Sequence, residues 1–170
     1  MVQRLEERDE ARRLDLYQWV IANCRLIPFI LFTDEASFTR DGINNTHNSH
    51  RCSNKNPHAI AERNSEHRFS VNVWCGVIDA QLSGSAVLLN RLKGHAYVDV
   101  LQNVLPLLLK EVPLAKRMRM LFQHDGASTH FSRLVTHHLN LTFPKGGIGR
   151  GSHVQWTPRS PEFTLLDFCL

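Results

Sequence analysis

The sequence lacks the cysteine patterns that mark several classes of protein. It has four Cys in 170 residues, and no two of them form a CxxC pair. A structural zinc site needs closely spaced Cys or His ligands, and a disulfide scaffold needs a denser set of Cys than this chain offers. We therefore expect neither, and a reducing, intracellular compartment fits this cysteine usage best. The four positions are Cys24, Cys52, Cys75 and Cys169.

Long apolar runs are also missing from the sequence. No stretch approaches the roughly 20 apolar residues that cross a bilayer. The N-terminal segment MVQRLEERDEARR is highly charged and has no apolar region of the kind found in signal peptides. We expect no association with a membrane, and no use of the glycosylation sequons at Asn44 and Asn140.

Motifs for phosphate binding and for histidine metal sites are absent as well. The glycine run Gly147-x-Gly149-x-Gly151 matches neither a dinucleotide-binding fingerprint nor a P-loop, so it is interpreted as a flexible surface loop. The ten His include no HExxH pair, and solvated or capping roles are the expectation for the pairs at 47/50 and 137/138.

The composition that remains is that of one globular domain. The hydrophobic fraction is 42%, the charged fraction is 21%, and the length is enough to bury a core. The formal charge is +4 and the pI is about 9.1, with Arg as the main basic residue. This charge favours an anionic partner such as nucleic acid about as well as it favours an ordinary basic surface.

Hydrophobic periodicity predicts alternating helices and strands. Helices are expected at 3–24, 94–112 and 130–141, the second ended by Pro113. Strands are expected at 27–33, 68–78, 84–90, 117–124 and 153–156, with Gly76 at a bulge and a long polar loop over 40–66. This order predicts a mixed α/β domain in which helices pack on one sheet.

Three acidic residues stand out by their context. Asp34 follows the apolar run FILFT, Asp125 follows MLFQH, and Asp167 lies at the predicted start of a helix that Thr164 would cap. Carboxylates at neighbouring strand ends converge and repel unless a cation lies between them. Mg²⁺ prefers oxygen ligands, and two such ions can support a phosphodiester displacement. Taken singly, each Asp is better explained as a cap or turn residue.

Four segments together resemble the catalytic domain of mariner-type transposases, in the DDE superfamily. They are LFTDEASFTRDGINNTHNSH, NVWCGVI, FQHDGASTHFS and WTPRSPEFTLLDF, and they occur in the family's order from about residue 29 to the C-terminus. The resemblance implies an RNase H-like fold, with a central mixed sheet flanked by helices. It divides the chain into an N-terminal helix and linker at 1–28 and the catalytic domain at 29–170.

The resemblance also implies a site and a reaction. Asp34, Asp125 and Asp167 would form a DDD triad that binds two Mg²⁺ or Mn²⁺ ions. Asp34 and Asp125 would share the metals, and Asp167 would complete one shell. The implied activity is cleavage and joining of DNA, with transposon ends and target DNA as partners, in a homodimer located in the nucleus. His124 and His130 flank this site without a catalytic role, and Gly126 is expected to permit a sharp turn after Asp125.

The sequence departs from the family pattern at several points. Ser128-Thr129 replaces a Pro-containing pair, and Leu165 stands where the family has Pro before the third acid. The sequence given ends at Leu170, so a truncated C-terminal helix and an incomplete domain are expected. Whether the chain is an active enzyme is therefore open. The alternatives are an inactive transposon relic, with or without nucleic-acid binding, and a ribonuclease of the same fold.

Overall fold

The computed structural model describes residues 9–39, 42–43, 70–79, 81–88, 92–157 and 166. Among them, no helix is long and apolar enough to cross a membrane. The helical elements are α1 (Asp9–Ala22), the 3₁₀ helix η1 (Cys24–Phe29), α2 (Gly94–Asp99), the π-helical turn η2 (Val100–Val104), α3 (Leu105–Leu108), α4 (Leu114–Arg117) and α5 (Arg133–Thr142). The strands are β1 (Ile30–Thr39), β2 (Gly42–Ile43), β3 (Ser70–Ile78), β4 (Gln81–Leu88), β5 (Leu121–Gln123), β6 (Gly147–Gly149) and β7 (Val154–Gln155).

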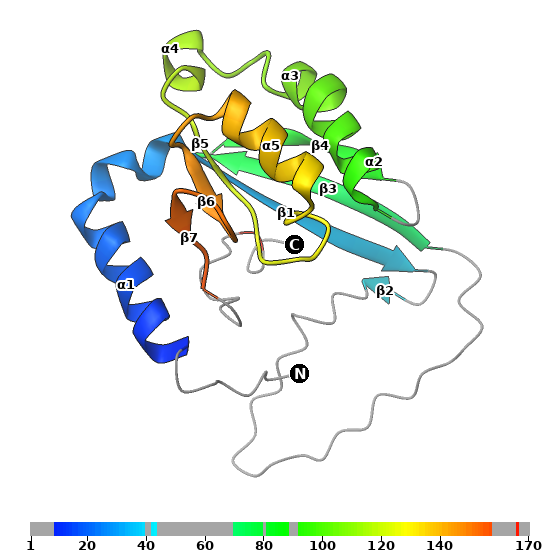
Figure 1. Ribbon diagram of the computed structural model, residues 1–170. Coiled ribbons are helices and arrows are strands. Elements are labelled where there is room, and N and C mark those ends of the chain that lie inside the picture. Colours follow the sequence, from blue (N-terminus) through cyan, green and yellow to red (C-terminus); the bar gives the residue numbers. More distant parts are fainter. Residues whose placement is uncertain are drawn as a thin grey trace.

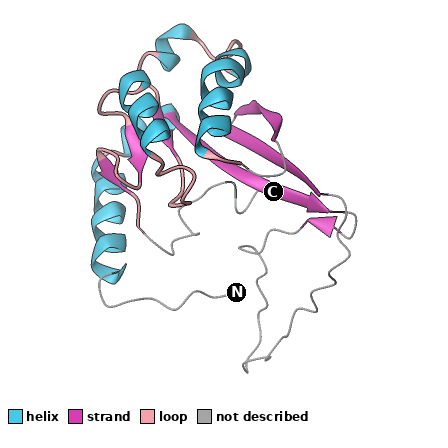
Figure 2. Ribbon diagram, turned by 45° about the vertical axis from the view of Figure 1, so that its right-hand side comes forward, coloured by secondary structure: helices cyan, strands magenta, loops and turns pink. Residues whose placement is uncertain are grey.

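The strands form one mixed sheet in the order β4-β3-β1-β5-β6-β7, with β2 paired to β1 (Figure 1). The β1–β3 and β3–β4 pairs are antiparallel, whereas β5, β6 and β7 continue from β1 in parallel. Parallel neighbours need crossover connections, and α2 to α5 lie in these crossovers. The predicted architecture of one mixed sheet flanked by helices is thus confirmed (Figure 2).

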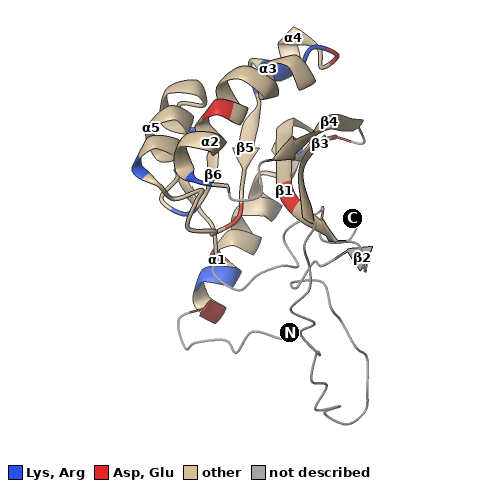
Figure 3. Cartoon of the chain, turned by 90° about the vertical axis from the view of Figure 1, so that its right-hand side faces the viewer, with Lys and Arg blue, Asp and Glu red and all other residues tan. Residues whose placement is uncertain are grey.

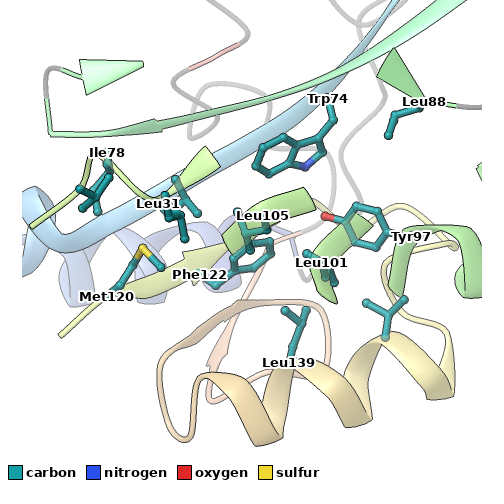
Figure 4. Packing of buried hydrophobic residues seen from close by; sticks show 13 residues of the cluster. Leu31, Trp74, Ile78, Leu88, Tyr97, Leu101, Leu105, Met120, Phe122 and Leu139 are labelled. Atoms are coloured by element: carbon teal, nitrogen blue, oxygen red, sulfur yellow. The ribbon is translucent and has the colours of Figure 1, made fainter. Parts of the chain in front are cut away.

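The main hydrophobic core lies between one face of the sheet and the helices α2, α3 and α5. Trp74 of β3 and Phe122 of β5 are fully buried there. The side chain of Leu139 points from α5 toward the sheet and closes the layer (Figure 4). Burying large aromatic and aliphatic side chains of this kind contributes about 1.5–3 kcal/mol each, so this layer fixes how the helices sit above β1 and β5.

The opposite face of the sheet carries α1. Leu16 of α1 packs in a second core cluster that includes Ile30, with Phe32 partly buried against it. Leu31 instead belongs to the main core. Because side chains alternate along a strand, Asp34 follows Phe32 on the α1 face and Glu35 follows Leu31 on the main-core face. Asp34 and Glu35 therefore lie on opposite faces of the sheet. Helix α1 shares the second core cluster with the sheet.

Strand β1 differs from the strand predicted at 27–33. Residues 24–29 form η1, which contains Pro28, and the strand runs from Ile30 to Thr39. It extends because β3 pairs with it along its whole length, from Leu31 with Ile78 to Thr39 with Ser70. The prediction that Asp34 ends a strand is therefore wrong, because Asp34 lies in the middle of β1.

The predicted helix at 94–112 is interrupted and shorter. It begins at Gly94, passes through the π-helical turn η2 and ends at Leu108. Pro106 lies at the start of α3. Proline has no N–H to donate to the preceding turn, and a widened turn is a common way to accommodate it. The apolar periodicity correctly predicts a helix here, but it does not predict the interruption that precedes Pro106.

Three further elements were predicted with mixed success. Strand β3 and the bulge next to Gly76 are confirmed, since the β3–β4 register shifts between Cys75 and Val77. The strand expected at 117–124 shrinks to β5, because residues 114–117 form α4. The prediction of a flexible surface loop at the glycine run is wrong, because Gly147–Gly149 form β6 between β5 and β7. Of the predicted loop at 40–66, only 42–43 lie among the described residues.

Candidate active site

Asp34 lies in the middle of the sheet, directly opposite Cys75 of β3. Its Oδ1 atom accepts a hydrogen bond of 2.8 Å from the backbone N–H of Glu35. Burial raises the pKa of the Cys75 thiol, and the charge of Asp34 raises it further. The carboxylate thus faces a neutral thiol.

Asp125 lies two residues beyond the end of β5, the strand that is parallel to β1 and adjacent to it. The last parallel pair is Phe32 with Gln123, and Asp34 and Asp125 each come two residues later. Just before the acids, the Thr33 hydroxyl donates to the Gln123 carbonyl at 2.7 Å. Parallel strands in this register bring the two acids to the same level of the sheet. Figure 3 shows acidic residues on β1 and on the segment that leaves β5.

The Asp125 carboxylate is held through its Oδ1 atom. That oxygen accepts a hydrogen bond of 2.9 Å from the backbone N–H of Ala127 and lies 2.6 Å from Nδ1 of His130. Burial acts to raise the pKa of Asp125, but the hydrogen bond and the charge of His130, together with the Ala127 N–H, hold it below its usual value. The carboxylate is ionised at neutral pH.

His130 bridges Asp125 to a second acid on β1. Its Nε2 atom lies 3.2 Å from Oε1 of Glu35, and its ring lies 4.6 Å from the ring of buried Tyr97. Burial acts to lower the pKa of His130. The charge of Glu35 and the hydrogen bonds to both carboxylates outweigh burial and raise the pKa to about 10. A positively charged imidazolium therefore lies between two carboxylates.

His124 differs from His130 although both rings are buried. The two ring centroids lie 5.4 Å apart. Burial lowers the pKa of His124 to about 4, and the charge of His130 adds to this effect. Neither ring nitrogen of His124 has a hydrogen-bond partner among the described residues. His124 is thus a neutral ring packed beside a charged one.

The third predicted acid, Asp167, lies outside the described residues. Leu166, directly before it, is buried. Within the described ranges no group of three or more His, Cys, Asp or Glu side chains is arranged to hold a metal ion. The structure therefore places Asp34 on β1 and Asp125 two residues beyond the end of the neighbouring strand β5, and the triad itself stays a prediction.

Sequence reasoning missed the contact that links Glu35, His130 and Asp125. Both extra residues stood beside predicted ones, since Glu35 follows Asp34 and His130 comes five residues after Asp125. The available signals were the adjacent pair of acids, Asp34 and Glu35, and the short spacing between Asp125 and His130. The contact joins residues 95 positions apart, so it depends on the strand register.

Gly126 does not have the role predicted for it. Among the described glycines, only Gly84 and Gly151 have positive φ. A Cβ atom on Gly126 would meet only Cδ1 of Trp156, at an ordinary contact distance of 3.8 Å. The chain turns after Asp125 without needing a glycine there.

Comparisons with known proteins identify the fold. No protein-family model and no curated protein matches the sequence. Solved structures of Mos1 transposase do match. The catalytic domain of Mos1 mariner transposase matches with a TM-score of 0.67 and 17% identity, over 99% of this chain and 70% of that one. The Mos1 paired-end complex with left transposon end matches with a TM-score of 0.68 and 18% identity, over 98% of this chain and 47% of that one.

A third match is the Mos1 mariner paired-end complex with Mn, with a TM-score of 0.68 and 18% identity over 99% of this chain. The chain spans about half the length of the Mos1 chains in the two complexes, at 47% and 48%. At this level of identity the match establishes the arrangement of the elements. The chain therefore has the RNase H-like fold of the Mos1 mariner transposase catalytic domain.

Proposed function

We propose that this chain is the catalytic domain of a DNA transposase, which cleaves and joins phosphodiester bonds with the aid of divalent cations. The observation that carries the proposal is the position of Asp34 and Asp125 at one level of adjacent parallel strands, in a fold shared with Mos1. The solved Mos1 structures include a paired-end complex with Mn and one with Mg. A strand transfer complex is also among them.

The side chains present fit Mg²⁺ or Mn²⁺. Both acids offer carboxylate oxygens, the donors that these hard cations prefer. The lowered pKa of Asp125 keeps it in the ionised form that a metal ligand needs. We assign Asp34 and Asp125 as shared ligands of two ions and Asp167 as the third acid.

The division of labour in the reaction follows from this assignment. Asp34, Asp125 and Asp167 would hold two divalent ions, which would provide an activated water and stabilisation of the leaving oxygen in a phosphodiester displacement. Asp34 holds its place through the continuous pairing of β1 with β3, and Asp125 holds its place through Ala127 and His130. Water cleaves the DNA strand to leave a 3′-OH, which then attacks the target strand.

The DNA partner has a candidate contact beside the acids. The guanidinium of Arg150 lies 4.6 Å from the ring centre of Phe131, and both side chains are exposed. Arg150 directly follows β6, and Phe131 directly follows His130, so the pair flanks the Asp125 loop. Arg binds phosphates, and an aromatic ring can stack on a base. We propose transposon ends and target DNA as substrates, a homodimer as the active form and the nucleus as its location.

Nicking of a supercoiled plasmid with Mn²⁺ tests this function. The unmodified chain is expected to convert the plasmid to the nicked form, and Asp34→Ala and Asp125→Ala are expected to reduce nicking to background. Asp15→Ala removes an exposed acid of α1 and serves as the matched control. Equal nicking by all four proteins would contradict the assignment of Asp34 and Asp125 as metal ligands. DNA binding without nicking by the unmodified chain would indicate an inactive nucleic-acid-binding protein.

A further inference from the structure

His130 connects the strand that carries the first acid to the second acid itself. Its Nε2 atom contacts Glu35, the residue after Asp34 on β1, and its Nδ1 atom contacts Asp125. An ionised carboxylate can only accept hydrogen bonds, so the ring donates an N–H to each side. His130 thereby links Asp125 to β1 through the side chain of Glu35.

The ring itself has little freedom to move. Only 3% of the His130 side chain is exposed, and it lies against Tyr97, which is completely buried in the main core. The carboxylate that it holds is different. Asp125 lies beyond the end of β5, and its side chain is partly exposed. A side chain in that position has rotational freedom unless a contact restrains it. The hydrogen bond from the buried His130 ring provides that restraint.

The two donors converge on one oxygen of Asp125. The Ala127 N–H and the His130 Nδ1–H both point to Oδ1. A carboxylate fixed through one oxygen presents the other in a defined direction. We propose that His130 is a positioning residue that fixes the Asp125 carboxylate so that its Oδ2 atom is presented to a divalent cation. This inference rests on the proposed function, because it takes Asp125 as a metal ligand.

The two amide side chains closest in shape to His separate the contacts of its two nitrogens. In His130→Asn the amide nitrogen takes the place of Nδ1, so the donor to Asp125 is retained and the contact with Glu35 is lost. In His130→Gln the amide nitrogen takes the place of Nε2, so the donor to Glu35 is retained and the contact with Asp125 is lost. Both variants remove the charge of the ring, so each serves as the control for the other with respect to charge.

Binding of Mn²⁺ to the protein without DNA, measured by isothermal titration calorimetry, is the readout. The thermal unfolding midpoint of each variant is measured in parallel. Partners that orient a metal ligand contribute about 10- to 100-fold to metal affinity. We expect His130→Gln to weaken Mn²⁺ binding by about that factor and His130→Asn by less than about 3-fold. Glu35→Gln keeps an oxygen acceptor for Nε2 and is expected to resemble His130→Asn.

The outcomes separate this inference from the proposed function. Weaker binding in both Asp125→Asn and His130→Gln, but not in His130→Asn, supports the positioning role. If Asp125→Asn weakens binding and His130→Gln does not, the metal site stands and the positioning role is overturned. If His130→Asn and His130→Gln weaken binding equally and unfold at equally lowered temperatures, the ring acts only through the fold. Unchanged binding in Asp125→Asn overturns both claims.

Discussion

The ring of His124 occupies the space that a side chain on Gly149 would need. A Cβ atom on Gly149 would lie 2.3 Å from Nε2 of His124 and 2.6 Å from its Cδ2 atom. The ring cannot easily give way, because it is buried next to Phe122 and His130. Strand β6 can therefore pair with β5 only if position 149 has no side chain, which explains why a glycine-rich segment forms a strand here.

Gly149→Ala is accordingly expected to destabilise the protein. Overpacking a buried contact costs about 1–3 kcal/mol in the free energy of unfolding, and urea denaturation followed by circular dichroism measures it. Gly126→Ala is the matched control, since its Cβ atom would meet only Trp156 at 3.8 Å. We expect that control to change the free energy of unfolding by less than about 1 kcal/mol. A larger loss in Gly126→Ala than in Gly149→Ala would contradict this account of β6.

The two buried histidines predict a maximum in the pH dependence of stability. The pKa of His130 is raised to about 10, so its contribution is full below the unfolded value of 6.5 and is lost as pH rises toward 10. The pKa of His124 is lowered to about 4, so its contribution is full above 6.5 and is lost as pH falls toward 4. Stability of the metal-free protein should therefore be greatest near pH 6.5.

Urea midpoints between about pH 4 and about pH 9, measured in a chelator, check this profile. The variant His130→Gln should lose the decline on the alkaline side and keep the decline on the acid side. The assignment of the alkaline decline to His130 fails if the variant and the unmodified protein fall in parallel above neutral pH.

Arg150 should contribute to DNA affinity. It follows β6 and lies over Phe131, beside the loop that carries Asp125. We expect Arg150→Ala to weaken binding of a short duplex by about 3- to 10-fold and to reduce the salt slope by about one. Fluorescence anisotropy at several salt concentrations measures both quantities.

The control for this prediction is Arg119→Ala. Its guanidinium lies 4.0 Å from the ring centre of Phe29, so it has the same kind of aromatic neighbour. It precedes β5, at the end of that strand away from Asp125. Affinity and salt slope should change little in Arg119→Ala. Equal losses of DNA affinity in the two variants would show that positive charge alone determines binding, and would contradict a specific contact of Arg150 with DNA.

The sequence was sufficient to predict the fold class and the strands that precede Asp34 and Asp125, but it failed to predict features that depend on tertiary contacts. Apolar runs before Asp34 and Asp125 correctly indicated strands, because burial on both faces of a sheet selects such runs. The length of β1 was missed because the second half gains its stability from pairing with β3. The strand β6 was missed because Gly149 is favoured by the ring of His124, a contact that no local pattern records.

The site shows the same division. Asp125 was identified from its place after an apolar run, and its partners were not. The bond from His130 to Glu35 arises only when β1 and β5 pair in one register and Tyr97 packs beneath the ring. Local sequence carries no information about such a register.

The most direct test of the central claim is a switch in metal preference in Asp125→Cys. A thiolate is a poor ligand for Mg²⁺ and a better one for softer ions. If the side chain at 125 contacts the cation that drives cleavage, plasmid nicking by Asp125→Cys should be lost with Mg²⁺ and restored in part with Mn²⁺ or Cd²⁺. Asp125→Ala should stay inactive with each metal. Nicking by Asp125→Cys that matches the unmodified protein with Mg²⁺, or that is absent with every metal in a folded variant, would contradict the assignment of Asp125 as a metal ligand.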